Sequence, residues 1–166
     1  MELARVIIGL AAVSVPSVAQ AGWQYTQWGM SSAEVAGASG GKTQPLVFDP
    51  NSVDPMLRDH LPEIAADAPT MHAPYQTGGR QFDVEFHFSN DRLDRATLHL
   101  KAPLDCFKLA GEMAAAYGIP DKHYERSNTS WWRDKEKGNH VMFSAWANEQ
   151  CTITYQPLSN KSDSGL

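Results

Sequence analysis

Apolar and polar residues alternate along residues 80–88, and this pattern predicts a β-strand with one face toward a core. The apolar positions are Phe82, Val84, Phe86 and Phe88, and the polar positions between them are Asp83, Glu85 and His87. A strand-like segment, residues 71–77, precedes this one across Gly78-Gly79, so the two are expected to form a hairpin. A third strand is expected from Leu93 to Leu100, with a change of apolar parity that predicts a bulge near Asp94-Arg95.

Two segments have the spacing of helices. Ser31 and Glu34 are separated as in a capping box, which predicts a helix from Ser32 to about Ser39, ending at Gly40-Gly41. The second helix is indicated by apolar residues at i, i+3, i+4, i+7 and i+11, namely Cys106, Leu109, Ala110, Met113 and Tyr117. Asp105 is its expected N-cap, and Gly118 followed by Pro120 ends it.

The remaining segments complete the predicted fold. Three further strands are expected at residues 129–134, 140–146 and 151–157. Residues 42–69 contain half of the ten prolines and predict an irregular surface loop, with a brief helical turn at residues 55–60. The fold class is therefore α+β, with two helices packed on an antiparallel sheet in tandem α-βββ units. One domain is expected over residues 22–158, followed by a disordered tail at 159–166.

The first 21 residues are typical of a cleaved secretory signal. Arg5 precedes an uncharged apolar run of 13 residues, from Val6 to Val18, and Ala19-Gln20-Ala21 has the small-x-small pattern of a cleavage site. A membrane anchor is the alternative, but 13 helical residues cover only about 20 Å of a hydrocarbon core roughly 30 Å thick. We expect a periplasmic or secreted protein, cleaved near Ala21 and without a membrane span.

Charge and cysteine content narrow the function classes. The chain carries a net charge of -5, which disfavours binding to nucleic acid and to anionic lipid. Its two cysteines, Cys106 and Cys151, are expected to form a disulfide in an oxidising compartment. Reactive or metal-bound thiols are the alternative, although the chain contains no Cys-x-x-Cys motif.

Several segments together resemble a group of uncharacterised exported proteins of alphaproteobacteria. They are Trp28-Gly29-Met30-Ser31 with Glu34-Val35, residues 82–100, a Cys-bearing helix ending Tyr117-Gly118-Ile119-Pro120, and residues 151–158. The tandem layout also resembles the small α/β modules of β-lactamase inhibitory protein and of the outer-membrane assembly lipoprotein BamE. The resemblance implies an action through protein contacts, and it assigns no functional residue.

Two groups of residues are candidates for a site. Glu85, His87 and His99 would lie on the polar side of the hairpin, where two imidazoles and a carboxylate are able to hold zinc. An ordinary solvated sheet face is the alternative. Trp131 and Trp132 are adjacent, so they point to opposite faces of their strand, and one of them is a candidate contact for a partner. Packing of both into the core is the alternative.

The sequence predicts an exported, non-catalytic protein that binds another envelope protein or a cell-wall component. No catalytic residue or cofactor is predicted, since the chain has no phosphate-binding loop and both cysteines are expected to be paired. An inhibitor of a periplasmic or foreign hydrolase, with residues 42–69 as its plug, is one alternative. A metal-binding protein or small enzyme built on the Glu85, His87 and His99 face is the other.

Overall fold

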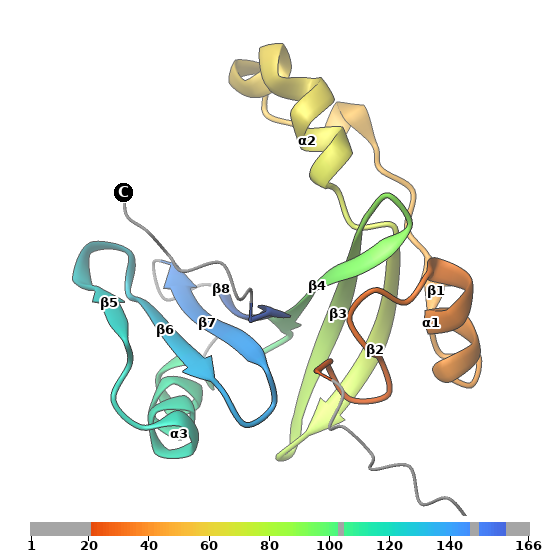
Figure 1. Ribbon diagram of the computed structural model, residues 1–166. Helices are drawn as coiled ribbons and strands as arrows, with labels where there is room; N and C mark the ends of the chain where they lie inside the picture. The colour runs from red at the N-terminus through yellow and green to blue at the C-terminus, as the bar shows by residue number, and fades with distance from the viewer. Residues whose placement is uncertain (1–20, 103–104, 147–149, 159–166) are drawn as a thin grey trace, which may run out of the picture.

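The structure of the protein is a computed structural model that describes residues 21–102, 105–146 and 150–158. One antiparallel sheet of eight strands, in the order β1-β2-β3-β4-β8-β7-β6-β5, forms its centre, and three α-helices accompany it (Figure 1). The strands are β1 (Gln44–Pro45), β2 (Met71–Thr77), β3 (Arg80–Ser89), β4 (Arg92–Leu100), β5 (Lys122–Tyr124), β6 (Thr129–Asp134), β7 (Asn139–Trp146) and β8 (Gln150–Pro157). The helices are α1 (Ser32–Ala38), α2 (Leu61–Asp67) and α3 (Cys106–Tyr117). This architecture confirms the predicted α+β class.

Short turns set the register of the first three long strands. Gly78 and Gly79 both have positive φ, at 55° and 75°, and form the tight turn between β2 and β3 that was expected. Asn90 and Asp91 also have positive φ and place Ser89 opposite Arg92. Further along, His87 pairs with Arg95 while Phe88 pairs with Leu93, so Asp94 is the extra residue of a bulge, as the parity change predicted.

The two halves of the sheet meet at their last strands. β4 pairs with β8 over four residues, with Leu98 opposite Ile153 and Ala96 opposite Tyr155. Each half consists of a helix, a short edge strand and a three-stranded meander, and the edge strands β1 and β5 were not expected from the sequence. They contain two and three residues, too few for a recognisable alternation.

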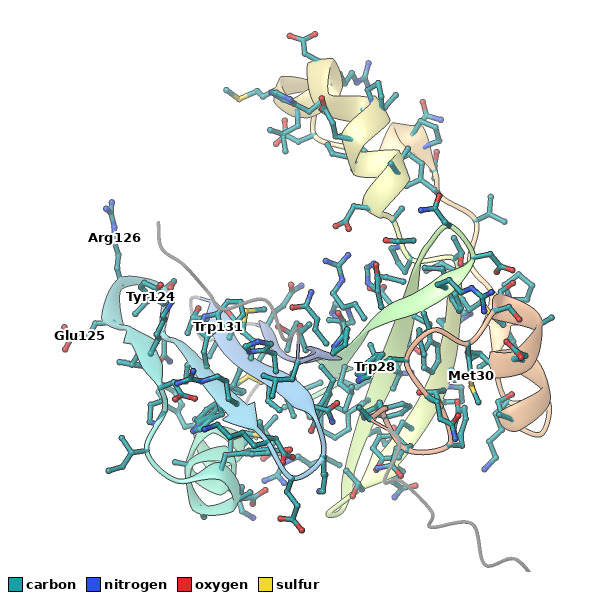
Figure 2. The ribbon with its side chains drawn as sticks, in the orientation of Figure 1. Trp28, Met30, Tyr124, Glu125, Arg126 and Trp131 are labelled. Carbon is teal, nitrogen blue, oxygen red and sulfur yellow. A yellow bond between two sulfur atoms is a disulfide. The ribbon has the colours of Figure 1, made fainter. Side chains whose placement is uncertain are left out.

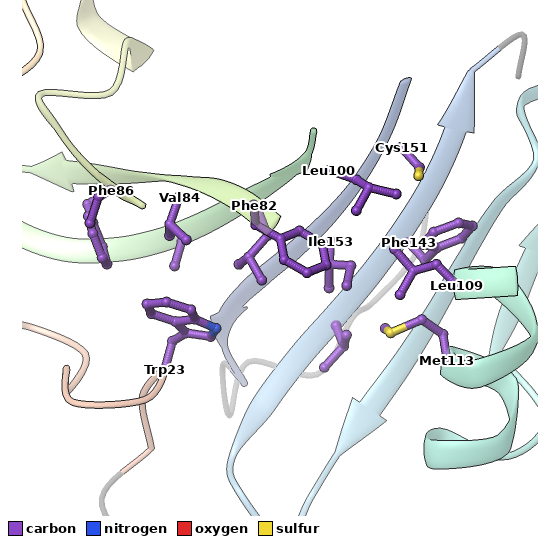
Figure 3. Close-up of a cluster of buried hydrophobic side chains, with 14 of the residues drawn as sticks. Trp23, Phe82, Val84, Phe86, Leu100, Leu109, Met113, Phe143, Cys151 and Ile153 are labelled. Atoms are coloured by element: carbon purple, nitrogen blue, oxygen red, sulfur yellow. The ribbon is translucent and has the colours of Figure 1, made fainter. Parts of the chain in front are cut away.

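The core lies on one face of the sheet. In the second half α3 covers this face, with Leu109 and Met113 beside Phe143 (Figure 3). In the first half the covering residue is Trp23, which is 4% exposed and makes edge-to-face contacts with Tyr75 and Phe86 at 5.0 and 5.7 Å. The residues just before α1 therefore cover the core face of the first half of the sheet, as α3 covers that of the second half.

Two links fasten α3 to the sheet. Cys106 at its first turn forms a disulfide with Cys151 of β8, with the Cα atoms 5.8 Å apart, which confirms the predicted pairing. Near its middle, Glu112 accepts two hydrogen bonds from the buried guanidinium of Arg80, at 2.6 and 3.0 Å. The predicted N-cap, Asp105, makes no capping hydrogen bond, and its carboxylate lies instead 3.8 Å from Arg80.

The helix α1 begins as predicted. The Ser31 hydroxyl accepts from the Glu34 amide, and the Glu34 carboxylate accepts from the Ser31 amide, so both halves of the capping box are present. Hydrogen bonds between Gly29 and Leu93 and between Leu93 and Met30 tie the start of the helix to the β3–β4 turn. The predicted signal at residues 1–21, apart from Ala21, and the predicted tail at 159–166 lie outside the described residues.

Residues 42–69 lie at the surface, as predicted, and the predicted helical turn at residues 55–60 is confirmed as a 3₁₀-helix, but the prediction of an otherwise irregular loop was wrong. Besides β1 and α2 they contain two 3₁₀-helices, Pro50–Ser52 and Pro55–His60. Asp49 and Asp54 cap these helices, and the prolines that follow occupy first-turn positions. A proline in the first turn is compatible with a helix, because the amide it lacks would have no intrahelical partner. These prolines therefore start helices instead of preventing them.

Candidate interaction surfaces

The sheet face opposite the core, here called the open face, carries side chains from every strand. One row of paired residues crosses the whole sheet: Lys122, Trp131, Met142, Thr154, Thr97, Glu85, His72 and Gln44. A parallel row contains Tyr124, Thr129, Ser144, Thr152, His99 and Asp83. In the part of the chain that the structure describes, the base of α2 contacts this face at His87 and Arg95, and the two rows form a surface of mixed chemistry.

Aromatic side chains gather at the β5–β6 end of the open face. Tyr124 is 52% exposed, and Trp131 is half-buried between its cross-strand neighbours Lys122 and Met142 (Figure 2). The Trp131 indole N–H is shielded from solvent and has no acceptor among the described residues. Such a donor costs roughly 1–3 kcal/mol relative to a satisfied one. This end of the open face is therefore not optimised for stability alone.

Trp132 points to the other face and is buried there, so it is not the member of the pair that is available to a partner. It is 4% exposed, lies 5.8 Å from the Tyr117 ring, and its indole N–H donates to the carbonyl oxygen of Gly118 at 3.0 Å. The opposite orientation of the two tryptophans was predicted, but the sequence TSWWRD has no alternation that says which of them is buried. Of the pair, only Trp131 belongs to the open face.

Small side chains that carry hydroxyl groups occupy the middle of the open face. Thr129, Ser144 and Thr154 are 8%, 8% and 6% exposed, and the Thr129 and Ser144 hydroxyls are hydrogen-bonded at 3.1 Å. Larger side chains lie on either side of them, with Tyr124 and Trp131 at one end and the histidine–carboxylate pairs at the other. Because the hydroxyl-bearing side chains are nearly covered, a partner would meet chiefly these aromatic and charged groups.

The third part of the open face is a set of histidine–carboxylate pairs. His99 Nε2 lies 2.8 Å from a Glu85 oxygen, and His72 Nδ1 lies 3.5 Å from an Asp83 oxygen. The hydrogen bond with His99 lowers the pKa of Glu85, and the same bond raises the pKa of His99. Both shifts favour an ion pair.

The proposed metal set is not assembled in this way. Phe86 pairs with Ala96 and Asp83 with His99, so His99 lies diagonally from Glu85 and not directly opposite it. His87 is opposite Arg95, four residues along β4 from His99, which corresponds to about 13 Å. Among the described residues, no group of three or more His, Cys, Asp or Glu side chains is arranged to hold a metal ion.

His87 instead takes part in a polar cluster at the base of α2. Its Nδ1 lies 2.9 Å from the carbonyl oxygen of Asp67 and 2.8 Å from a guanidinium nitrogen of Arg95. The same Arg95 nitrogen is 2.6 Å from the Asp67 carboxylate. Burial lowers the pKa of His87, and the charge of Arg95 acts in the same direction. This cluster joins the end of α2 to β3 and β4.

Residues 47–67, here called the arm, project from that cluster. Figure 1 shows α2 and the segment before it standing away from the sheet. Neither the 3₁₀-helices nor α2 contains a buried residue. At the base of the arm, Leu46 donates to Thr70, and Thr70 donates to Phe86 of β3. The arm is thus a surface element held at its base, and it is the second candidate interaction surface.

A depression of about 500 Å³ lies between the end of α3 and the β6–β7 turn. Tyr117, Trp132 and Ile119 contribute apolar walls, while Asp121 and Arg133 form an ion pair at 2.7 Å at its rim. Cavities that bind small molecules usually enclose most of the ligand and present a few convergent polar groups. In this depression the rim carboxylate of Asp121 already accepts from Arg133, so it is a poorer candidate than the two surfaces above.

No protein-family model, curated protein or solved structure matches this chain. The resemblance to exported alphaproteobacterial proteins and to tandem α/β modules therefore stays a hypothesis. Within the part of the chain that the structure describes, no helix is long and apolar enough to cross a membrane.

Proposed function

We propose that the protein is an exported, non-catalytic binding protein that recognises an envelope protein or a cell-wall component through the open face. The observation that carries the proposal is the group of Tyr124, Trp131 and Met142 at one end of the open face, beside side chains that carry hydroxyl groups. Tryptophan and tyrosine dominate the binding energy of many interfaces, since they bury a large area at a small entropic cost.

Two further observations support it. The disulfide consumes both cysteines, so neither supplies a thiol nucleophile, and a disulfide fits an oxidising compartment outside the cytosol. The open face also carries polar groups beside its aromatic ones, as in the Glu85–His99 pair, and interfaces commonly surround aromatic anchors with a polar rim.

Binding is tested with the purified chain as bait in envelope extract and in a sedimentation assay with insoluble cell wall. Trp131→Ala is expected to lower the retained ligand about 30-fold, the effect of a 2 kcal/mol contact. Phe107→Ala is the matched control, because Phe107 is 68% exposed on α3 and belongs to the other side of the sheet.

The fold of each variant is checked by near-ultraviolet circular dichroism and by its thermal midpoint. Loss of binding in Trp131→Ala with an unchanged fold, and retention in Phe107→Ala, supports the proposal. Equal binding by Trp131→Ala, Tyr124→Ala and the unmodified protein would remove the open face as the site.

A further inference from the structure

The arm contains more apolar surface than a solvent-exposed segment needs. Six of its apolar side chains are Val47, Phe48, Met56, Leu57, Leu61 and Ile64, and none of them belongs to the core cluster or packs against it. Val47 and Met56 are 86% and 89% exposed, and Leu57 is 50% exposed. Exposed apolar groups are ordinary when they are scattered, but a group of them on one projecting element marks a contact site.

Their spacing gives the arm an amphipathic character. Leu61 and Ile64 are three residues apart in α2 and share one side of that helix, where both are half-buried, whereas Leu57 lies in the preceding 3₁₀-helix and is 50% exposed. Arg58, Asp59 and Glu63 lie between these apolar residues in the sequence and are exposed. An amphipathic segment normally buries its apolar side against its own core, and here that burial is incomplete.

The arm also accounts for most of the net negative charge of the chain. It contains five acidic residues and one basic residue, a net charge of -4, whereas the whole chain has a net charge of -5. The acidic residues are Asp49, Asp54, Asp59, Glu63 and Asp67, of which Asp67 is paired with Arg95 at the base. The remaining four are exposed around the apolar tip.

We propose that the arm docks on a basic protein, whose apolar groove receives Met56 and Leu57 and whose Lys or Arg side chains face Asp54, Asp59 and Glu63. Exposed apolar side chains alone would suit several kinds of partner. The acidic residues around them favour a basic protein, because its charge is complementary. A second copy of the chain would bring either another acidic arm, which is repelled, or a remaining surface whose net charge is only -1 (-5 less -4), so it offers no basic counterpart to the arm. An anionic membrane surface is disfavoured for the same reason.

Contacts at the base of the arm hold it in one orientation, and this supports a role in docking. The contacts of Asp67 with Arg95 and His87 fix the end of α2 on the sheet, and the Leu46 and Thr70 hydrogen bonds fix the other side. A docking element held in its binding geometry loses less conformational entropy when it binds. The arm and the open face are separate surfaces, so this inference goes beyond the proposed function and does not depend on it.

The test uses a photo-crosslinking amino acid in the full-length protein, in the cells that produce it. The crosslinker is placed at Met56 in one sample and at Phe107 in a control sample, since both positions are exposed and apolar. The captured protein is identified by mass spectrometry. Capture at position 56 of one protein with a basic surface, and its absence at position 107, is the expected result.

The same protein is then purified and titrated with charge variants of the arm. In Asp54→Asn/Asp59→Asn/Glu63→Gln the affinity is expected to fall about tenfold, since three exposed ion pairs are lost. Asparagine retains the capping oxygen of Asp54, so the 3₁₀-helix is preserved. Met56→Ser is expected to weaken binding without altering the thermal midpoint, because Met56 contributes nothing to the core. Raising the salt concentration should weaken the unmodified complex more than that of the charge variant.

Several outcomes would overturn the inference. Capture of a second copy of the chain, of lipid, or of a protein without a basic surface would each contradict the proposed occupant. The same holds if no adduct forms at position 56, or if the three-charge variant binds the captured protein as tightly as the unmodified chain. Loss of binding in Trp131→Ala alone would bear on the open face and leave this inference standing.

Discussion

Removal of the disulfide is expected to destabilise the domain by several kilocalories per mole. Cys106 and Cys151 are separated by 45 residues, and this loop includes the whole of α3 and the strands β5, β6 and β7. In the chain-entropy treatment, opening a loop of this size raises the entropy of the unfolded chain by an amount equivalent to about 4 kcal/mol at 25 °C. Small domains have total stabilities of about 5–15 kcal/mol, so the bond is a large share of the whole.

The measurement compares oxidised and reduced protein by urea unfolding. Both cysteines are buried, at 2% and 1% exposure, and reduction keeps their side chains in place, so the difference isolates the crosslink. The thermal midpoint should fall by roughly 10–15 °C for a domain of this length. The slope of unfolding free energy against urea should rise, since the unfolded chain without the crosslink exposes more surface.

The double variant Cys106→Ala/Cys151→Ala serves as a second measurement. It should lose at least as much stability as reduction does, because it also removes two buried sulfur atoms. A loss below about 1 kcal/mol in both experiments would refute the reasoning. It would mean that the arrangement of α3 on the sheet is maintained mainly by packing and by Arg80–Glu112.

Three other predictions concern single residues. Trp23→Ala should lower the free energy of unfolding by about 3–5 kcal/mol in urea titration, since a buried aromatic side chain is lost; a loss under 1 kcal/mol would show that Trp23 does not close the core. Asn139→Ala should cost about 1–3 kcal/mol, because Asn139 accepts from the Trp28 indole and donates to a backbone carbonyl; hydrogen exchange of the Trp28 indole should accelerate, and an unchanged rate would contradict this contact. By NMR titration the pKa of His87 should lie below 6.5 and that of His99 above it. The contribution of His87 to stability is then present above pH 6.5 and is lost as the pH falls through its folded pKa. The contribution of His99 is present below pH 6.5 and is lost as the pH rises through its folded pKa. Shifts of the two pKa values in the same direction would contradict the two environments.

The sequence predicts elements well where a periodic pattern is long enough to be recognised. The alternation of Phe82, Val84 and Phe86 predicted β3, and the Ser31–Glu34 pair predicted α1. The pairing of β3 with β4 was less predictable, because the two-residue turn Asn90-Asp91 and the bulge at Asp94 together decide which side chains are opposite. A difference of two residues was enough to separate His87 from His99.

The candidate surfaces were predicted only in part. The segment 42–69 was expected at the surface, but the sequence did not say which of Trp131 and Trp132 is buried, because their strand has no alternation. The exposed apolar residues of the arm were missed, although Met56 and Leu57 stand among its acidic residues in the sequence. Five prolines suggested an irregular loop, and their first-turn positions became evident only once Asp49 and Asp54 were seen as caps.

The contact between Trp28 and Asn139 has a consequence for how the chain folds. These residues are 111 positions apart, and Asn139 also binds the carbonyl of Gly22, 117 positions away. The packing around the first half of the sheet is therefore completed by a residue that is synthesised late in the chain. Proteins dominated by such distant contacts fold slowly, because the entropy of closing a long loop is lost before the contact forms. Until β7 is available, the Trp28 indole and the Gly22 carbonyl lack their shared partner, so the segment that carries Trp23 is held by its contacts with the first half of the sheet alone.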